Sequence, residues 1–312
     1  TPLYSSAASD VYKRQLLVDG NYYLLAGYTY SFGTGTPTSA NGYIIKISNN
    51  GNLSWSKVWG ESGNDVLNKI LKTPDGNYLA VGYFTAEDNQ RYIWALKLDY
   101  NGNIIWEKRL GGGNSYANSL AIGSDGNYII GGGYFDQPYL IKISSSTGDI
   151  IAEYKETISS LNGLEDVIVD SAGRIVGNFN SPGTGLIFLD ENNLQKIKDN
   201  LYLSSSNYFN SLKEAKGIYF LSGYYFRGFL SNSLSPILGL ISSDGVIKKY
   251  RGFSFVEGRS GVKASAINTY DNSYLLVGGF EDKKIGFIIK TDAQLNTGEI
   301  TGFEKNKFLK WL

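Results

Sequence analysis

The stretch Asp75–Tyr83, DGNYLAVGY, decides the fold, because copies of its first half recur along the chain. Asp-Gly-Asn-Tyr also occurs at Asp19–Tyr22 and at Asp125–Tyr128. Degenerate versions follow at Ala172-Gly173, Lys216-Gly217 and Asp271-Asn272. The resulting anchors, at positions 19, 75, 125, 172, 216 and 271, lie about 50 residues apart on average. The chain therefore repeats one structural unit about six times.

Each unit contains four short apolar runs separated by turns. One run follows the anchor, as in Tyr78–Tyr83, and the next often carries a lysine, as in Ile93–Leu98 with Lys97. Asn-Gly and Asp-Gly dipeptides between the runs supply the positive φ that tight hairpins need. No window keeps a helical period, so we expect almost no helix. Four strands per unit predict one all-β domain over residues 1–312, a closed β-propeller of about six four-stranded blades, with seven as the alternative.

The two ends of the chain bear on how the ring closes. The first unit begins with its incoming strand, about Val11–Val18, which could instead complete the last blade. Six sets of four strands use the chain up to about Phe303, and an apolar tail, residues 304–312, is left over. This tail either closes the ring as a strand, packs under its own propeller, or adds as a strand to a neighbouring subunit. Addition head to tail would build a filament. The predicted self-assembly contacts are Phe308, Leu309, Trp311 and Leu312.

Composition excludes several kinds of chemistry. The chain has no cysteine, methionine or histidine, so it lacks thiolate nucleophiles, Cys-based zinc sites and the usual general base near neutral pH. Its 29 basic and 29 acidic residues balance, which argues against nucleic acid as a partner. No apolar run is long enough to span a bilayer. We therefore predict no catalytic, cofactor-binding or metal-binding residues, no cofactor, and an extracellular or cell-surface location.

Tryptophans stand at matching places in the first two units. The pattern from Gly60 through Gly111 resembles the secreted bacterial and archaeal β-propeller repeats that combine Asp-Gly-x-Tyr with Gly-Asn-x-x-Trp. The segments Trp55–Gly60 and Trp106–Gly111 are also similar to the tryptophan-docking motif of quinoprotein-like propellers. In those families the tryptophan is structural, so the resemblance implies that Trp55 and Trp106 lock neighbouring blades. It implies no particular activity.

Several local motifs permit a chemical and a structural interpretation. Asp99–Asn103 could be a calcium loop, but no closing acid follows, and an Asx turn is favoured. The repeated lysines could ring an anion, although stems packed on the sheet with paired or solvated ammonium groups are favoured. The glycine runs Gly111–Gly113 and Gly131–Gly133 open no helix, so a phosphate site is disfavoured. The lysines are Lys46, Lys97, Lys142 and Lys290.

Two further sets bear on carbohydrates. The carboxylate pairs Glu61/Asp65, Glu87/Asp88 and Glu165/Asp166 could serve glycoside hydrolysis, which needs two acids about 5–10 Å apart. Aromatic residues that end the same strand in five of the units could stack on sugars, although core or rim packing is the commoner fate. These are Tyr28, Tyr83, Tyr134, Tyr224 and Phe280.

The sequence thus predicts a secreted, non-catalytic propeller with a structural or interaction role. Its expected partner is itself, in an extracellular filament or surface layer. The alternative is a propeller that binds or cleaves carbohydrate, with a glycan as partner. A quinoprotein-type enzyme is a third alternative, which rests on the tryptophan motif alone.

Overall fold

The computed structural model describes residues 12–31, 39–156, 162–180, 183–204, 207–226, 234–253, 263–268, 273–280, 285–292 and 294–304. These residues form 24 strands and no helix, which confirms the all-β prediction. None of this part of the chain forms a helix of the length and apolarity needed to cross a membrane. The predicted tail contacts Phe308, Leu309, Trp311 and Leu312 lie outside the described residues.

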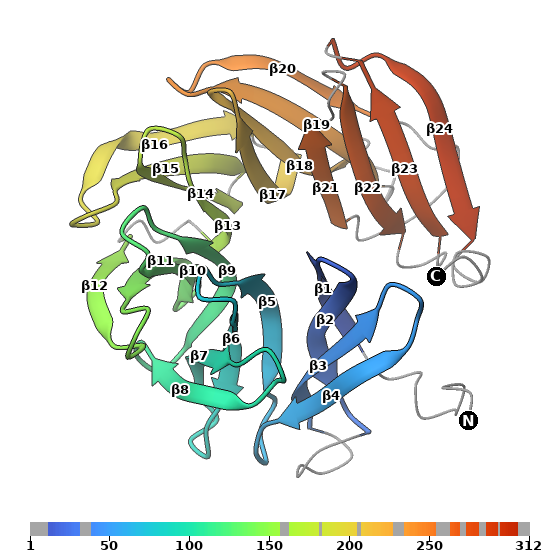
Figure 1. Ribbon diagram of the computed structural model, residues 1–312. Helices are drawn as coiled ribbons and strands as arrows, with labels where there is room; N and C mark the ends of the chain where they lie inside the picture. Colours follow the sequence, from blue (N-terminus) through green and yellow to red (C-terminus); the bar gives the residue numbers. More distant parts are fainter. Residues whose placement is uncertain are drawn as a thin grey trace. The chain divides into compact units, whose positions relative to one another are not determined.

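The strands form six antiparallel sheets, each made of four strands that are consecutive in the chain (Figure 1). Sheet 1 contains β1 (Tyr12–Asp19), β2 (Tyr22–Thr29), β3 (Asn41–Ser48) and β4 (Leu53–Trp59). Sheet 2 contains β5 (Val66–Lys72), β6 (Tyr78–Thr85), β7 (Arg91–Leu98) and β8 (Ile104–Leu110). Sheet 3 contains β9 (Ser115–Ile122), β10 (Tyr128–Tyr134), β11 (Gln137–Ile143) and β12 (Ile150–Lys155).

The second half of the chain repeats this order. Sheet 4 contains β13 (Leu164–Val169), β14 (Arg174–Asn180), β15 (Thr184–Asp190) and β16 (Lys196–Ser204). Sheet 5 contains β17 (Asn207–Ala215), β18 (Ile218–Phe226), β19 (Leu234–Ser242) and β20 (Ile247–Gly252). Sheet 6 contains β21 (Lys263–Asn268), β22 (Tyr274–Phe280), β23 (Ile285–Thr291) and β24 (Thr297–Glu304).

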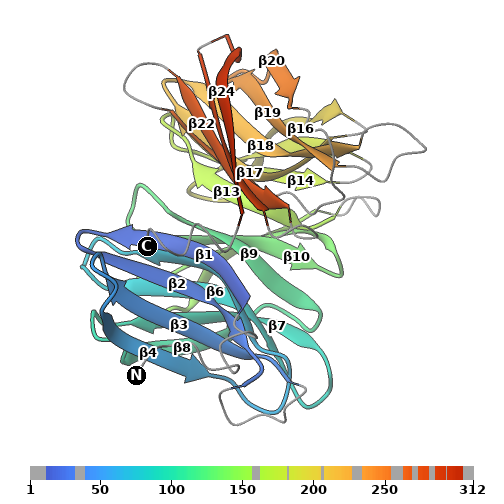
Figure 2. The ribbon, with the colours of Figure 1, turned by 90° about the vertical axis from the view of Figure 1, so that its right-hand side faces the viewer.

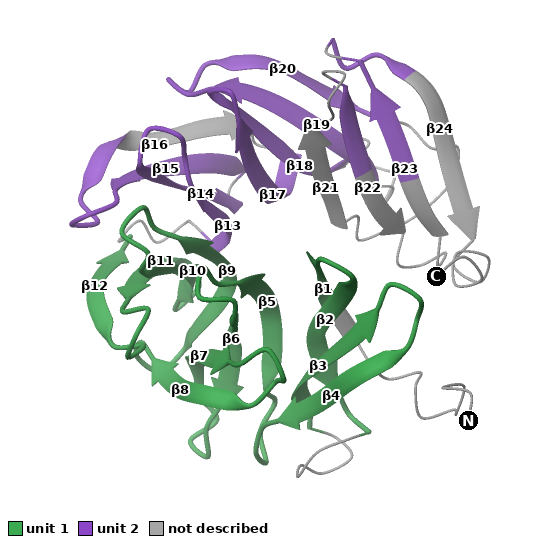
Figure 3. Ribbon diagram, viewed as in Figure 1, with its two compact units in different colours: residues 1–159 green, residues 160–312 purple. Residues whose placement is uncertain are grey.

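The chain divides into two compact units, Thr1–Ser159 and Ser160–Leu312 (Figure 3). Sheets 1 to 3 belong to the first unit and sheets 4 to 6 to the second. Within the first unit β1 lies next to β5, and β5 next to β9. Within the second, β13 lies next to β17 and β17 next to β21. The first strands of neighbouring sheets therefore lie next to one another, and the fourth strand of each sheet lies at the opposite edge of that sheet.

The repeated anchors form the turn between the first and second strands of a sheet. Gly76 and Gly126 have φ of 82° and 81°, where a side chain would be strained. The degenerate anchors behave in the same way, since Gly173 and Gly217 have φ of 71° and 73°. The anchor at Asp271 lies outside the described residues.

The N-terminal strand does not complete the last sheet. β1 pairs with β2 along its length, from Lys13 opposite Gly27 to Asp19 opposite Tyr22, and Figure 2 shows β1 to β4 side by side. Sheet 6 already has four strands of its own. The alternative in which Val11–Val18 closes the last blade is therefore wrong, because the two-residue Gly20-Asn21 turn returns β1 to β2.

Apolar side chains between neighbouring sheets form the core. Leu24 and Ile44 of sheet 1 pack with Tyr78 and Trp94 of sheet 2 in one buried cluster. Similar clusters join sheets 2 and 3, sheets 4 and 5, and sheets 5 and 6. Because these clusters are buried, the polar groups among them must find hydrogen-bond partners there.

Candidate functional site

Three of the repeated lysines are buried, and two of them, Lys46 and Lys97, contact the next sheet. Lys46, Lys97 and Lys142 are each at most 2% exposed, whereas Lys290 is exposed. Lys97 lies 2.9 Å from the Asp75 carboxylate of its own sheet and also donates to the Tyr128 hydroxyl of sheet 3. The predicted pairing with a carboxylate is found for Lys97 with Asp75 and for Lys142 with Asp125, whereas the solvated alternative is wrong for all three lysines because they are buried. They are internal cations and do not form an anion-binding ring.

Two other junctions, of sheets 1 and 2 and of sheets 4 and 5, show variants of this contact. Lys46 donates to the Tyr78 hydroxyl at 2.9 Å, and Tyr78 in turn donates to Asp19. In sheet 4 the lysine position is held by Phe188, and Arg174 supplies the cation by donating to the Tyr219 hydroxyl at 2.9 Å. Hydrogen bonds to Tyr219 and Arg174 lower the pKa of Asp170, against the opposing effect of its burial. A cation, a tyrosine and an aspartate thus join adjacent sheets.

The two predicted tryptophans also span sheets. Trp55 on β4 donates from Nε1 to the Tyr100 carbonyl of sheet 2 at 3.2 Å. A Cβ on Gly102 would lie 3.1 Å from the Trp55 ring, and one on Gly148 would lie 3.0 Å from Trp106. Both glycines belong to a turn of the next sheet. The locking role of Trp55 and Trp106 stays a prediction.

The carboxylates of the predicted turn and acid-pair motifs accept hydrogen bonds from backbone N–H groups. Asp99 accepts hydrogen bonds from the backbone N–H groups of Asn101 and Asn103, each at 2.8 Å, as an Asx turn does. Asp166 is buried and accepts the N–H of Leu212 at 3.0 Å. Asp88 accepts the N–H of Gln90 at 2.9 Å. Among the described residues, no group of three or more acidic side chains is placed to hold a metal ion.

The predicted aromatic set does not form one platform. Tyr83 lies under the Arg91 guanidinium at 4.7 Å, and Tyr224 stacks on Tyr208 with ring centroids 5.4 Å apart. Tyr134 faces the other side of its sheet, because Gly133 takes the strand position that Tyr83 has in sheet 2. The side chain of Phe280 lies outside the described residues.

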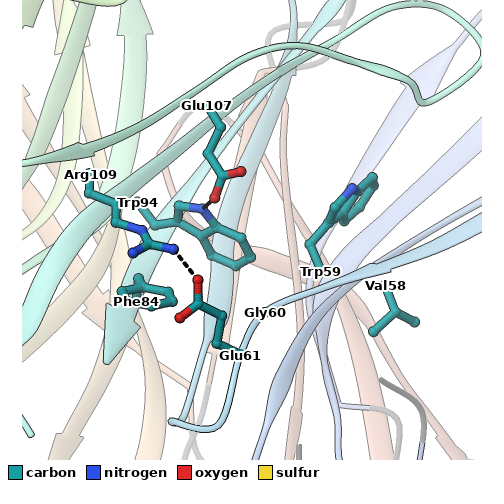
Figure 4. A pocket seen from close by; sticks show the side chains of 8 residues that line it. All are labelled: Val58, Trp59, Gly60, Glu61, Phe84, Trp94, Glu107 and Arg109. Atoms are coloured by element: carbon teal, nitrogen blue, oxygen red, sulfur yellow. Dashed lines mark hydrogen bonds and ion pairs between the residues drawn. The ribbon is translucent and has the colours of Figure 1, made fainter. Parts of the chain in front are cut away.

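A groove of about 280 Å³ lies between sheets 1 and 2 (Figure 4). We call it the 1–2 groove. The end of β4 supplies one wall, β6 and β7 supply the floor, and β8 supplies the opposite rim. Its lining residues are Val58, Trp59, Gly60, Glu61, Phe84, Trp94, Glu107 and Arg109. The sequence did not single out this set, because its members come from four strands and one loop.

Two side-chain pairs organise the groove. The Trp94 indole donates from Nε1 to Glu107 Oε1 at 2.7 Å, and its ring is 1% exposed. Arg109 pairs with Glu61 at 2.5 Å, and its guanidinium lies 3.7 Å from the Phe84 ring centroid. Figure 4 shows both pairs on one side of the groove, with the Trp59 indole on the other. Both carboxylates are thus held by partners on sheet 2.

The loop that carries Glu61 is held by a buried aspartate. Asp65 is fully buried and accepts the N–H groups of Glu61 and Thr85, at 2.7 and 2.9 Å. Burial raises the pKa of Asp65, and these two hydrogen bonds oppose that shift. Gly60 has φ of 142°, and a Cβ there would lie 2.6 Å from Asp65 Oδ2. Of the predicted Glu61/Asp65 pair, only Glu61 therefore reaches the groove.

Comparison with known proteins identifies the fold alone. No family model and no curated protein matches the chain. Among solved structures, virginiamycin B lyase from Staphylococcus aureus matches 95% of this chain and 85% of its own at 12% identity, with a TM-score of 0.61. BamB from Moraxella catarrhalis matches 93% of this chain and 88% of its own at 10% identity, with a TM-score of 0.55.

A structure described as the Dos1 propeller matches 93% of this chain and 70% of its own, at 13% identity and a TM-score of 0.56. These neighbours are β-propellers, so the chain has a β-propeller fold. At 10–13% identity the likeness extends to the fold and to no activity.

Proposed function

We propose that this β-propeller is a non-catalytic interaction module that binds its ligand in the 1–2 groove. The observation that carries the proposal is the groove itself, in which the partly buried Trp59 lies opposite polar groups held in place by hydrogen bonds. Ligand pockets commonly combine apolar walls with a few oriented polar groups. Glu107 is held by Trp94 and Glu61 by Arg109, an arrangement suited to holding a ligand in one orientation.

A closed ring of about six blades, secretion and an extracellular location belong to the same proposal. They are supported by the repeat pattern and by the absence of cysteine and methionine, the two most readily oxidised residue types. The balanced charge supports a partner other than nucleic acid.

Thermal unfolding with three classes of probe tests the binding role. The probes are neutral oligosaccharides, lysine-rich peptides and glutamate-rich peptides. We expect one class to raise the melting temperature of the wild type, and Trp59→Ala to abolish the shift. The proposal fails if no class shifts the melting temperature, or if the shift survives in Trp59→Ala.

Self-association is a second candidate, favoured by a recurring surface feature. At the start of the outer strand of five sheets, or in the turn just before it, apolar side chains are about 40–55% exposed. They are Leu53, Ile104, Ile105, Ile150, Ile151, Ile197, Val246 and Ile247. Exposed apolar surface is common where proteins associate. Each outer strand also has an edge left unpaired within its own sheet, which can accept a strand of another molecule.

A further inference from the structure

We infer that the 1–2 groove takes one neutral sugar ring, the terminal residue of a glycan. This inference rests on the proposed binding role and adds the class of ligand. It depends on three observations: a comparison with the neighbouring junction, the balance of charge, and the size of the groove.

Comparing the junction of sheets 1 and 2 with that of sheets 2 and 3 shows which residues of the groove are needed for sheet packing and which are available to bind a ligand. Sheet 3 repeats the frame of sheet 2, with Tyr139, Glu153 and Lys155 at the positions of Trp94, Glu107 and Arg109. The Tyr139 hydroxyl donates to Glu153 at 2.8 Å, as Trp94 does to Glu107. An aromatic ring, a carboxylate and a cation at these positions are therefore a feature shared by two sheets, and so belong to the packing of the fold.

The residues that face this frame differ between the two junctions. At the junction of sheets 2 and 3, Leu110 and Gly112 stand where the 1–2 groove has Trp59 and Glu61. Leu110 is buried, and a Cβ on Gly112 would lie 2.9 Å from the Tyr134 ring, so that ring fills the space. Joining two sheets therefore does not require Trp59 or Glu61, and these residues create the groove.

The charges favour a neutral ligand. Glu61, Glu107 and Arg109 leave one net negative charge, which disfavours phosphate or carboxylate ligands. Arg109 is already engaged with Glu61 and with the Phe84 ring. Hydroxyl groups can donate to both carboxylates and accept from the remaining guanidinium N–H groups.

The apolar wall and the volume complete the match. Trp59 packs partly against the core, and its remaining exposed part lines the groove together with Val58, whereas the rest of the exposed lining is mainly polar. A sugar ring has an apolar C–H face and a polar edge, which match this wall and the Glu61, Glu107 and Arg109 rim. A volume of about 280 Å³ lies just below the usual range for ligand pockets, so it suits one ring with the rest of the glycan outside.

Calorimetric titration with neutral trisaccharides that differ in their terminal residue tests the inference. We expect at least one to bind, with an affinity that is the same at 50 and 500 mM salt, because no charge is neutralised. Trp59→Ala should weaken binding at least tenfold, and Trp59→Phe should restore most of it. Glu107→Gln keeps the acceptor for Trp94 and should weaken binding about threefold to tenfold.

The matched control is Glu153→Gln, the same change in the frame of sheet 3, which should leave the affinity unchanged. Melting temperatures of all variants show whether a loss of binding is a loss of folding. If a lysine-rich peptide binds instead, with an affinity that falls with salt and in Glu107→Gln, the sugar inference is wrong and the binding role stands. If neither peptides nor sugars bind, both fail. Release of reducing ends from a bound glycan would contradict the non-catalytic role.

Discussion

The indole of Trp55 on β4 reaches the Tyr100 carbonyl in the β7–β8 turn at 3.2 Å, and its ring lies against Gly102. One side chain thus connects the outer strand of sheet 1 to the outer turn of sheet 2. Trp106 and Gly148 repeat the ring contact one sheet further on.

Replacing Trp55 by alanine should therefore lower the free energy of unfolding. We expect a loss of about 2 kcal/mol, less than the ~3–5 kcal/mol of a fully buried tryptophan, because Trp55 is partly exposed. Urea unfolding measures it, with Trp55→Phe as a control that keeps part of the ring contact. A loss of less than about 0.5 kcal/mol in the free energy of unfolding, the scale of ordinary surface substitutions, would contradict the proposed locking role of Trp55.

The buried Lys97–Asp75 pair should respond unequally to loss of each partner. Asp75→Ala leaves the Lys97 ammonium buried with only Thr73 and Tyr128 as acceptors. Lys97→Met removes the charge and keeps an apolar stem of similar length, and Asp75 is about half exposed to water. We expect Asp75→Ala to cost about 3 kcal/mol and Lys97→Met clearly less. Equal losses in urea unfolding would show that burial of the cation is not the controlling factor.

Stability should rise as the pH increases from about 8. Burial lowers the pKa of Lys46 from 10.5 to about 8, against the attraction of Asp19. Between these values the unfolded chain binds more protons than the folded chain, so the free energy of unfolding increases with pH. The rise should disappear in Lys46→Met.

Above pH 10 the free energy of unfolding should instead fall with increasing pH. Burial and the hydrogen bond to Asp19 raise the pKa of Tyr78 well above 10, and burial likewise raises those of Tyr139 and Tyr219. The unfolded chain then loses tyrosine protons that the folded chain keeps, so stability falls. Urea unfolding at steps between pH 7 and 11 should therefore show a maximum. A steady decrease from pH 7 would contradict the assignment of Lys46.

Substitution in the β10–β11 turn should raise the free energy of unfolding. Phe135 and Asp136 have φ of 47° and 61°, conformations that asparagine and glycine adopt more easily. Phe135 is 60% exposed, so little packing is lost when it is replaced. The double variant Phe135→Asn/Asp136→Gly should gain about 1 kcal/mol in urea unfolding. A loss would show that the Phe135 contact with Tyr134, at 4.8 Å between ring centroids, outweighs the strain.

Removal of residues 308–312 tests self-assembly. If Phe308, Leu309, Trp311 and Leu312 join molecules, the full chain should form oligomers or filaments and the shortened chain should be a monomer. Sedimentation velocity of both forms decides it, with Ile105→Lys/Ile151→Lys as a separate test of the exposed outer strands. Two monomeric chains at every concentration would rule out assembly through the tail.

What the sequence determined by itself is the local repeat. Asp-Gly and Asn-Gly turns impose positive φ, and the apolar runs between them have the length of strands, so the sheets and their turns follow from short-range rules. The matched positions of Trp55 and Trp106 are also visible in the chain.

Only the tertiary structure decided which side chains meet between neighbouring sheets. Lys97 is buried because sheet 3 places Tyr128 over it, 31 residues later in the chain. The 1–2 groove exists because Glu61 pairs with Arg109 of another sheet, 48 residues later in the chain, while Trp59 lines the opposite side. Neither relationship has a local signal, since it depends on which faces meet when two sheets pack. The sequence therefore predicts the blade, and the packing of one blade on the next creates the site.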